Sequence, residues 1–428
     1  MSVIDAINNL LKIIGDAVAN LINGIFGPGL VADVVVMLLA ALVLCATAAL
    51  AFMALTWIER KVVARIQDRI GPNQAGPFGL LQPLADGIKM FTKEDATPAS
   101  ADRWVYNAAP LIIAVFALVT YAVFPLAPGV VGTDLSIGVF FVIAVGSAST
   151  IAILMAGWGS NNKYSLMGAF RTVAQLVGYE VPMLLNVLPV IMLAGSMSLV
   201  DIVERQTLAY GNPGIPFIVY LPLCALVFFI SGIAETGRSP FDLLEAESEI
   251  VAGFHIEYSG MKFALFFLGE YVNTLAVSIM FATLFLGGYA GPVLPPYLWL
   301  IVKAGLVFFV LMWLRGTLPR VRVDQLMSLN WKFLVPMSIV NIIGVMVLSK
   351  VFVTNPGQAA DAGGIVVTAG AQALILFAAN IAVLLAGLTI VARRARVLRK
   401  SEEAVLEDRR AANRAAAVAQ PVAQPAAH

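Results

Sequence analysis

The sequence predicts an all-α polytopic membrane protein with about nine transmembrane helices and an N-terminal amphipathic interfacial helix. Of its 428 residues, 60% are hydrophobic and 12% are charged, and the mean hydropathy of +0.89 exceeds that of soluble domains. Several apolar runs approach or exceed the length of about 18 residues that marks a membrane-spanning helix. Lys and Arg residues gather on alternate connections between these runs, as they do on the cytoplasmic side of membrane proteins.

The first 30 residues form a segment of their own. Their apolar residues recur at spacings of three and four, as on one face of a helix, and Gly27-Pro28-Gly29 ends the pattern. Asp5 and Asp16 interrupt the apolar character and no basic region precedes it, so we expect an amphipathic helix at the membrane surface rather than a cleavable signal. A poorly ordered leader is the alternative. The apolar face comprises Ile4, Ile7, Leu11, Ile14, Val18, Leu21 and Ile25.

Nine apolar runs divide the remaining chain. We expect residues 31–353 to form the core membrane domain, residues 354–392 to add a further transmembrane helix, and residues 393–428 to be a basic, Ala-rich cytoplasmic tail. The predicted spans are residues 31–57, 105–127, 137–158, 172–195, 216–234, 262–286, 297–315, 332–353 and 369–392.

Basic residues predict the orientation of these spans. If the N-terminus is outside, the inside connections and the tail carry 23 Lys and Arg residues and the outside connections carry 3, with Lys303 inside a span. This asymmetry is typical of a cytoplasmic C-terminus. The connections after the first and the fifth span then also face the cytoplasm.

The residues that bind redox cofactors are scarce. Cys45 and Cys224 both lie inside apolar runs, and His255 and His428 are the only histidines. This composition excludes a self-contained iron–sulfur centre or haem. Neither a phosphate-binding glycine loop nor a dinucleotide fingerprint is present, and no nucleic-acid partner is expected. Any redox function must therefore be that of a scaffold.

The first cytoplasmic connection is unusually constrained. Gly71-Pro72-Asn73 and Gly76-Pro77-Phe78-Gly79 predict a tight loop with little conformational freedom, and Pro83 suits the first turn of a new helix. A rigid loop suits docking to a partner or lining a cavity. Plain anchoring by basic residues is the alternative, but it leaves the glycines unexplained. The basic residues here are Arg60, Lys61, Arg65 and Arg69.

Residues 235–257 form an acidic connection whose only Lys or Arg is Arg238. Carboxylates crowded at a membrane boundary resist ionising together, so we expect some to hold protons near neutral pH. A solvated acidic loop is the alternative. Ser239 and Pro240 can also start a helix, which would make Asp242 a capping residue. The acids are Glu235, Asp242, Glu245, Glu247, Glu249 and Glu257.

Three ionisable residues stand out inside predicted spans, namely Glu180, Glu270 and Lys303. Each costs about 2.5–3.5 kcal/mol to insert into a bilayer, so we expect it to face a partner or water. A packing pair is the alternative, either Lys303 with a carboxylate or Glu270 with Tyr271 or Asn273.

Short motifs along the chain are specific in combination. They are Glu59-Arg60-Lys61, Gly71-Pro72-Asn73, Gly76-Pro77-Phe78-Gly79-Leu80-Leu81-Gln82-Pro83-Leu84-Ala85-Asp86, Thr92-Lys93-Glu94, Gly178-Tyr179-Glu180, Ala234-Glu235-Thr236-Gly237-Arg238-Ser239-Pro240-Phe241-Asp242-Leu243, Glu245-Ala246-Glu247-Ser248-Glu249, Glu257-Tyr258-Ser259, Glu270-Tyr271-Val272-Asn273 and Asp324-Gln325-Leu326-Met327. Through them the sequence from about residue 31 to about residue 350 resembles the H subunit of respiratory complex I, the proton-pumping NADH:quinone oxidoreductase.

The resemblance implies a membrane-arm subunit in the cell inner (plasma) membrane, surrounded by lipids and neighbouring membrane-arm subunits. Its substrate would be a quinone, with no covalently bound cofactor. The iron–sulfur clusters and FMN would lie in partner subunits, among them the peripheral-arm subunits that hold the terminal cluster and the quinone headgroup. The tunnel residues would be Glu59, Arg60, Arg65, Arg69 and Asp86. The proton path would use Glu180, Glu235, Asp242, Glu245, Glu247, Glu249, Glu257 and Glu270, with Arg238 as counter-charge.

His255 departs from the resemblance, which leads us to expect Asn at this position. It is either a hydrogen-bonding substitute or a protonatable step beside Glu257. Two other functions stay open. One is the equivalent subunit of a hydrogenase, a ferredoxin-linked or an F420H2-linked membrane complex. The other is a stand-alone ion transporter, against which the Gly- and Pro-rich connection and the lack of an obvious repeat argue.

Overall fold

A computed structural model describes residues 10–27, 29–207, 214–243, 253–292, 294–353, 365–366 and 368–419. Within these ranges, eight helices are long and apolar enough to cross a membrane, and the shorter apolar helix α10 adds a ninth. The predicted fold class is thus confirmed. The elements that form the bundle and its connections are α2 (Leu10–Phe26), α3 (Leu30–Ile66), α4 (Gln82–Thr92), α5 (Arg103–Val119), α6 (Gly138–Gly159), α7 (Lys163–Ala194), α8 (Leu199–Arg205), α9 (Phe217–Tyr220), α10 (Pro222–Glu235), α12 (Gly260–Phe285), α13 (Pro296–Thr317), α14 (Val323–Leu329), α15 (Val335–Val351) and α17 (Ala369–Ala419).

Shorter elements complete the described chain. Single 3-10 turns lie at Pro77–Gly79, Thr120–Val123 and Gly253–His255, and one turn of π-helix, Asn330–Leu334, joins α14 to α15. Two-residue strands β1 (Phe352–Val353) and β2 (Ile365–Val366) pair in parallel. They lie between α15 and α17 in the chain and form the only described sheet.

The chain divides into two compact units within α17. Residues 1–380 contain the helix bundle and all the residues discussed below. The second unit begins at Ile381, and its described part is the continuation of α17 to Ala419. The predicted final span and the start of the basic tail are therefore one unbroken helix.

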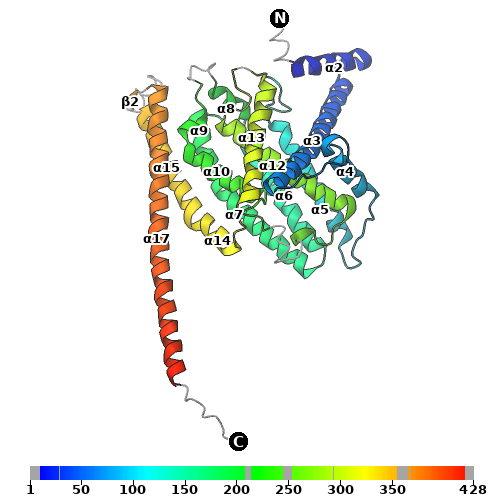
Figure 1. Ribbon diagram of the computed structural model, residues 1–428. Coiled ribbons are helices and arrows are strands. Elements are labelled where there is room, and N and C mark those ends of the chain that lie inside the picture. The colour runs from blue at the N-terminus through cyan, green and yellow to red at the C-terminus, as the bar shows by residue number, and fades with distance from the viewer. Residues whose placement is uncertain are drawn as a thin grey trace. The chain divides into compact units, whose positions relative to one another are not determined.

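Helix α7 lies at the centre of the first unit and packs against α6, α10 and α15. Figure 1 shows these helices side by side. The helix starts at Lys163, earlier than predicted, because the Asn162 side chain accepts a hydrogen bond from the Tyr164 backbone N–H at 3.0 Å and caps it. It ends at Gly195, whose φ of 69° suits a glycine stop.

Helix α3 is longer than a bilayer is thick. Its 37 residues extend about 55 Å at 1.5 Å per residue, and only 6% of its apolar stretch is buried in the bundle. Its last turns pack against α12 and α13 and bury Glu59. The helix therefore carries Glu59 and Arg60 to the end of the bundle that is predicted to be cytoplasmic.

The predicted N-terminal helix forms as α2 and turns into α3 at Gly27, which has a φ of 75°. Figure 1 shows α2 lying across the end of α3 at a steep angle. Ile14, Leu21 and Ile25 are exposed on one side of it, as a helix in contact with lipid requires. Its place at the membrane surface stays a prediction.

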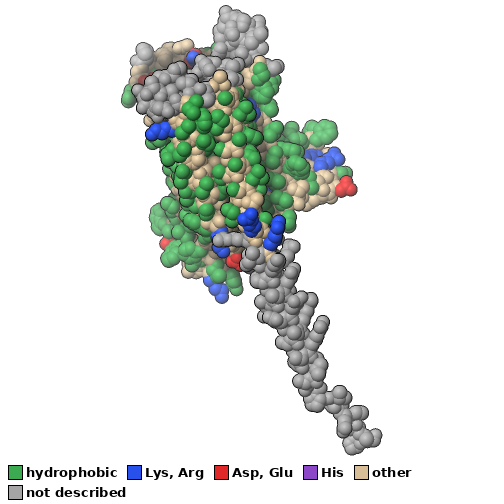
Figure 2. All heavy atoms as spheres, turned by 90° about the vertical axis from the view of Figure 1, so that its left-hand side faces the viewer, with side chains coloured by type: hydrophobic (Ala, Val, Ile, Leu, Met, Phe, Trp, Pro, Cys, Tyr) green, Lys and Arg blue, Asp and Glu red, His purple; other side chains and the backbone are tan. Residues whose placement is uncertain are grey.

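Tryptophans gather at one end of the bundle. Trp104, Trp158 and Trp313 are exposed at the ends of α5, α6 and α13 that adjoin the predicted cytoplasmic connections, and Trp331 is exposed in the π-helical turn before α15. Indole rings favour the membrane interface. Figure 2 shows hydrophobic side chains over most of the face turned to the viewer, as a lipid-facing surface requires.

Candidate functional site

The described part of the acidic connection, Thr236–Leu243, leaves α10 as a series of turns. Gly237 has a φ of 62°, which reverses the chain directly after the helix. The Ser239 hydroxyl donates to the Leu318 carbonyl at 3.1 Å, and Arg320 pairs with Asp242 at 3.0 Å. The predicted helix start at Ser239 is therefore wrong within these residues, since both side chains bind the segment after α13 instead of capping a helix.

A chain of ion pairs crosses this end of the bundle, with its two central members, Glu59 and Arg238, buried. Arg238 Nη1 donates to Glu59 Oε1 at 2.6 Å, and Arg238 Nη2 is 3.4 Å from Glu270 Oε1. Arg315 also pairs with Glu59. The order Arg315–Glu59–Arg238–Glu270 alternates in sign and draws its members from α13, α3, the acidic connection and α12.

Arg238 is the centre of this chain. Its side chain is 4% exposed, and its guanidinium lies 4.4 Å from the centre of the Tyr271 ring. Burial alone would lower the pKa of Arg238, but the charges of Glu270 and Glu59 outweigh it and raise this pKa. A guanidinium can bind two carboxylates at once, which an ammonium does poorly. Arg238 is therefore a permanent charge held between two acids.

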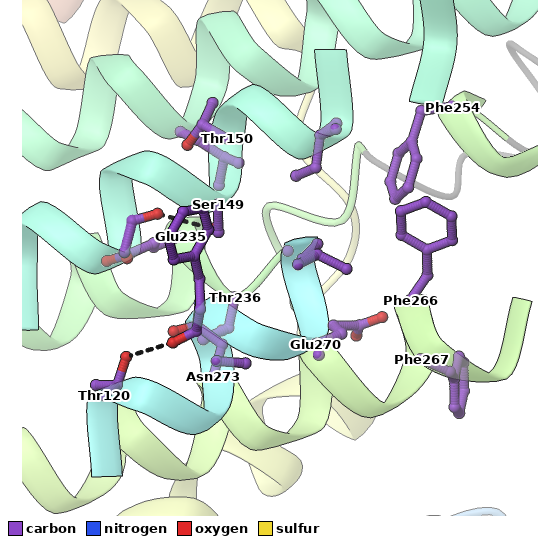
Figure 3. A pocket seen from close by; sticks show the side chains of 18 of the residues that line it. Thr120, Ser149, Thr150, Glu235, Thr236, Phe254, Phe266, Phe267, Glu270 and Asn273 are labelled. Atoms are coloured by element: carbon purple, nitrogen blue, oxygen red, sulfur yellow. Dashed lines mark hydrogen bonds between the residues drawn. The ribbon is translucent and has the colours of Figure 1, made fainter. Parts of the chain in front are cut away.

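Next to this chain lies a cavity of about 70 Å³. Its lining includes three acids, Glu180 from α7, Glu235 from α10 and Glu270 from α12. None of the described lining residues is a Lys or Arg. Figure 3 shows Glu235 and Glu270 at this cavity, with phenylalanine rings along one side. The space is large enough for several water molecules. The structure thus brings together three of the predicted acids from three helices.

Neutral polar groups complete the lining, and no sequence pattern had marked any of them as a cavity residue. The Thr120 hydroxyl donates to the Phe116 carbonyl at 3.0 Å and the Ser149 hydroxyl to the Gly146 carbonyl at 2.6 Å, as the dashed lines in Figure 3 mark. With their hydrogens engaged, these oxygens can only accept. They suit a protonated carboxyl or a water as hydrogen-bond donor. Thr150 and Asn273 lie beside them.

The remaining acids of the prediction do not reach this cavity in the described chain. Glu257 accepts a hydrogen bond from Asn162 Nδ2 at 2.6 Å, at the start of α7, and Asp242 pairs with Arg320. Neither lines the cavity. Glu245, Glu247 and Glu249 lie outside the described residues.

A second cluster surrounds the start of α4. Arg60 pairs with Asp86 at 2.5 Å, and Lys89 lies 3.4 Å from the same carboxylate. Burial would raise the pKa of Asp86, but the hydrogen bond and charge of Arg60 outweigh it and lower this pKa. The predicted residues Arg65 and Arg69 are exposed nearby.

The loop before α4 is as constrained as predicted. Gly79 has a φ of 77°, and a β-carbon placed on it would lie 2.3 Å from the Pro72 carbonyl oxygen. No other residue can occupy this position without moving the backbone. The Trp57 indole N–H donates to the Phe78 carbonyl at 3.3 Å and ties the loop to α3.

Lys303 is paired with no acid of the described chain. Its ammonium donates to the Leu286 and Ala290 carbonyls, each at 2.6 Å, and so binds the end of α12. The described residues thus do not show the alternative of a packing pair between Lys303 and a carboxylate. Glu270 instead pairs with Arg238.

His255 lines the cavity and lies between the rings of Phe254 and Phe263, at 5.0 and 5.3 Å. Burial lowers its pKa to about 4. The ring is therefore neutral near pH 7, which favours the interpretation of His255 as a substitute for Asn over that of a protonatable step.

His255→Asn should flatten the pH dependence of stability on the acid side. The unfolded chain, with a histidine pKa of about 6.5, binds a proton that the folded chain refuses until about pH 4. The stability that the neutral His255 ring contributes is therefore fully present above pH 6.5, and about 3 kcal/mol of it is lost as the pH drops to about 4. Thermal unfolding across this range measures it. If wild type and variant lose the same stability over this pH range, His255 is not held in its neutral form by burial.

Among the described residues, no group of three His, Cys, Asp or Glu side chains could hold a metal ion. The family model described as NADH dehydrogenase matches residues 39–346, which include the ion-pair chain, the cavity and the Arg60–Asp86 cluster. Curated relatives at about 50% identity are named as the H subunit of NADH-quinone oxidoreductase. The chain belongs to this H-subunit family.

Three relatives in the H-subunit family illustrate the likeness. The protein of Dehalococcoides mccartyi strain CBDB1 is 53% identical over 287 residues, which are 67% of this chain and 79% of the relative. The second H subunit of Geobacter sulfurreducens is 49% identical over 298 residues, 68% and 89% of the two chains. The H subunit of Rickettsia prowazekii is 46% identical over 309 residues, 70% and 89%. Helices α2 and α17 lie outside the family match.

Proposed function

We propose that this chain is the membrane-arm subunit of an H⁺-translocating NADH:quinone oxidoreductase that forms the quinone tunnel with peripheral-arm subunits and begins the proton path. It carries no redox centre itself. The observation that carries the proposal is the chain Arg315–Glu59–Arg238–Glu270, because it joins the cytoplasmic end of α3 to the acid-lined cavity. A charge that changes at one end of such a chain is felt at the other.

The tunnel half of the proposal rests on the cytoplasmic end of α3. Glu59 is buried there, and Arg60 and Asp86 bind each other beside the rigid loop. Arg65 and Arg69 are exposed and can meet acidic groups of a peripheral-arm subunit. The partner would complete the tunnel and hold the terminal iron–sulfur cluster and the quinone headgroup.

The coupling follows from electrostatics. Reduction of a quinone adds negative charge and draws protons. Negative charge near the Glu59 end attracts the Arg238 guanidinium, which weakens its longer contact of 3.4 Å with Glu270. Glu270 then loses its cation, and a carboxylate without a cation in a low-dielectric site favours protonation. A hundredfold change in proton occupancy corresponds to about 2.7 kcal/mol.

The proton path would continue through the cavity. Glu235 and Glu180 share it with Glu270, and waters between them can relay protons. Glu245, Glu247 and Glu249 would feed it from the cytoplasm. Glu257 and Asp242, bound to Asn162 and Arg320, would shape the field rather than carry protons. The C-terminus would lie in the cytoplasm and the chain in the plasma membrane, beside other membrane-arm subunits.

Purification of the tagged chain in mild detergent tests this proposal. We expect peripheral-arm subunits with iron–sulfur clusters and FMN to copurify and to reduce quinone with NADH. A photoreactive quinone should label residues 57–91. Copurification of a hydrogenase, or of subunits that oxidise ferredoxin or F420H2, would show that the complex uses an electron donor other than NADH. A chain that purifies alone and transports ions would overturn the proposal.

A matched pair of glycine variants tests the docking loop. Gly79→Ala should abolish copurification, because the added methyl group would meet the Pro72 carbonyl at 2.3 Å and displace the loop. Gly305→Ala in α13 is the control, since its methyl group would meet no atom within 4 Å. Equal yields of complex from both variants would exclude the loop as a docking element.

A further inference from the structure

One buried amide binds the acidic connection from the side of α7. Gln175 is 2% exposed, and its Nε2 donates to the Ala234 carbonyl at 2.7 Å and to the Phe241 carbonyl at 2.9 Å. Both amide hydrogens are thereby used. The two acceptors lie on either side of the segment that contains Glu235 and Arg238, so Gln175 holds the two ends of this segment together.

The two hydrogen bonds fix the distance between the Ala234 and Phe241 carbonyl oxygens. The hydrogens of one amide nitrogen diverge at a set angle in one plane, so their two acceptors are held at a set separation. Ala234 directly precedes Glu235. At the other end, the Phe241 N–H donates to the Arg238 carbonyl at 2.9 Å. A change in either acceptor position therefore moves Glu235 or Arg238.

The orientation of the Gln175 amide is also determined. If the amide were flipped, its oxygen would face two carbonyl oxygens, and like dipoles repel. In the described chain, Gln175 Oε1 is buried without a hydrogen-bond partner. The side chain thus keeps both donors on the turn although its own acceptor goes unused.

The turn is held from its other side as well. The Val321 N–H donates to the Pro240 carbonyl at 2.9 Å, next to the Ser239 and Asp242 contacts described above. On the α7 side, the Tyr179 ring lies 5.7 Å from that of Phe241. Gln175 and Tyr179 are one helical turn apart and precede Glu180. Helix α7 therefore places its own acid and the turn as one unit.

We infer that Gln175 is a positioning residue, whose amide holds Glu235 at the cavity and Arg238 between Glu59 and Glu270. The inference rests on the proposed function, because it takes those three acids and Arg238 to couple quinone reduction to proton transfer. Gln175 itself does not line the cavity and touches no reacting group.

Gln175→Met in the intact complex tests the inference. Methionine keeps the length and apolar volume of the side chain but donates no hydrogen bond. We expect coupled quinone reduction to fall about tenfold and its pH profile to shift, because Glu235 and Arg238 lose their fixed positions. An activity and pH profile equal to those of wild type would overturn the inference.

Asn186→Leu is the matched control for loss of stability. Asn186 is a buried amide on the same helix, and its Nδ2 also donates twice, to the Pro182 carbonyl at 2.8 Å and the Ser338 hydroxyl at 2.7 Å. Neither acceptor belongs to the turn. We expect this variant to unfold at a lower temperature with an unchanged pH profile. A pH shift as large as that of Gln175→Met would reduce Gln175 to a general structural residue and overturn the inference.

Gln175→Glu adds a readout that a packing role would not move. A protonated glutamic acid can still donate to one of the two carbonyls, whereas the ionised form faces both with negative charge. Its activity relative to wild type should therefore recover as the pH falls, and that of Gln175→Met should not. Glu235→Gln separates the two hypotheses. If that variant loses coupling while Gln175→Met retains the wild-type profile, only the positioning inference fails.

Discussion

Arg238→Gln is expected to abolish coupled quinone reduction and to destabilise the subunit by about 1–3 kcal/mol, since Glu270 is 28% exposed and solvent screens the ion pair that it loses. Glu59 keeps Arg315 in this variant, but Glu270 loses the cation that it pairs with at 3.4 Å. Quinone reduction with NADH and thermal unfolding of the purified complex measure the two effects. Unchanged activity would contradict the role of the ion-pair chain.

Two further variants separate stability from coupling at Arg238. Arg238→Gln combined with Glu270→Gln also removes the carboxylate that loses this arginine, so stability should return in part while activity should not. Arg320→Gln breaks only the partly exposed pair with Asp242 and should cost about 1 kcal/mol or less. If Arg320→Gln were as damaging as Arg238→Gln, the position of the arginine in the chain of ion pairs would not matter.

Glu235→Gln is expected to lower coupled turnover about a hundredfold. The amide has nearly the same shape as the carboxyl but cannot take up a proton, and positioned acid–base groups contribute factors of about 10²–10⁴. Glu235 shares the cavity with Glu180 and Glu270, so its loss interrupts a path rather than a single pair. Quinone reduction and proton pumping should fall together, as measured in proteoliposomes.

Glu257→Gln is the matched control for Glu235→Gln. Glu257 also belongs to the acidic connection, but it lies against Asn162 and outside the cavity, and a glutamine oxygen can accept the same hydrogen bond. We expect most of the activity to remain. Full coupled activity in Glu235→Gln would refute the proton path through this cavity.

The sequence could predict the spans because hydropathy is a local property. A run of apolar residues has to cross the bilayer as a helix whatever its neighbours are, since unpaired backbone groups are too costly in lipid. The same locality made the constrained loop at Gly79 predictable, and it singled out Glu180 and Glu270 as acids inside apolar runs. It failed at Ser239 and Asp242, where a helix-start pattern was overridden by contacts with the segment after α13.

The candidate site was only partly predictable. Arg315 looked like one more basic residue at the cytoplasmic end of a span, and nothing around Gln175 distinguished it from other polar residues near a membrane boundary. Both side chains bind partners that lie far away in the sequence: Arg315 and Glu59 are 256 positions apart, and Gln175 and Phe241 are 66 apart. No pattern within one helix encodes such a contact.

The sequence by itself determined the fold class, the number of spans, the family and the set of acids from which a proton path could be built. Only the tertiary structure decided that Glu180, Glu235 and Glu270 share one cavity, that Glu257 lies apart from it, and that Arg238 joins two acids from different helices. The physical reason is that composition and periodicity act along one helix. Side-chain partners, in contrast, depend on how the helices are rotated and packed against one another.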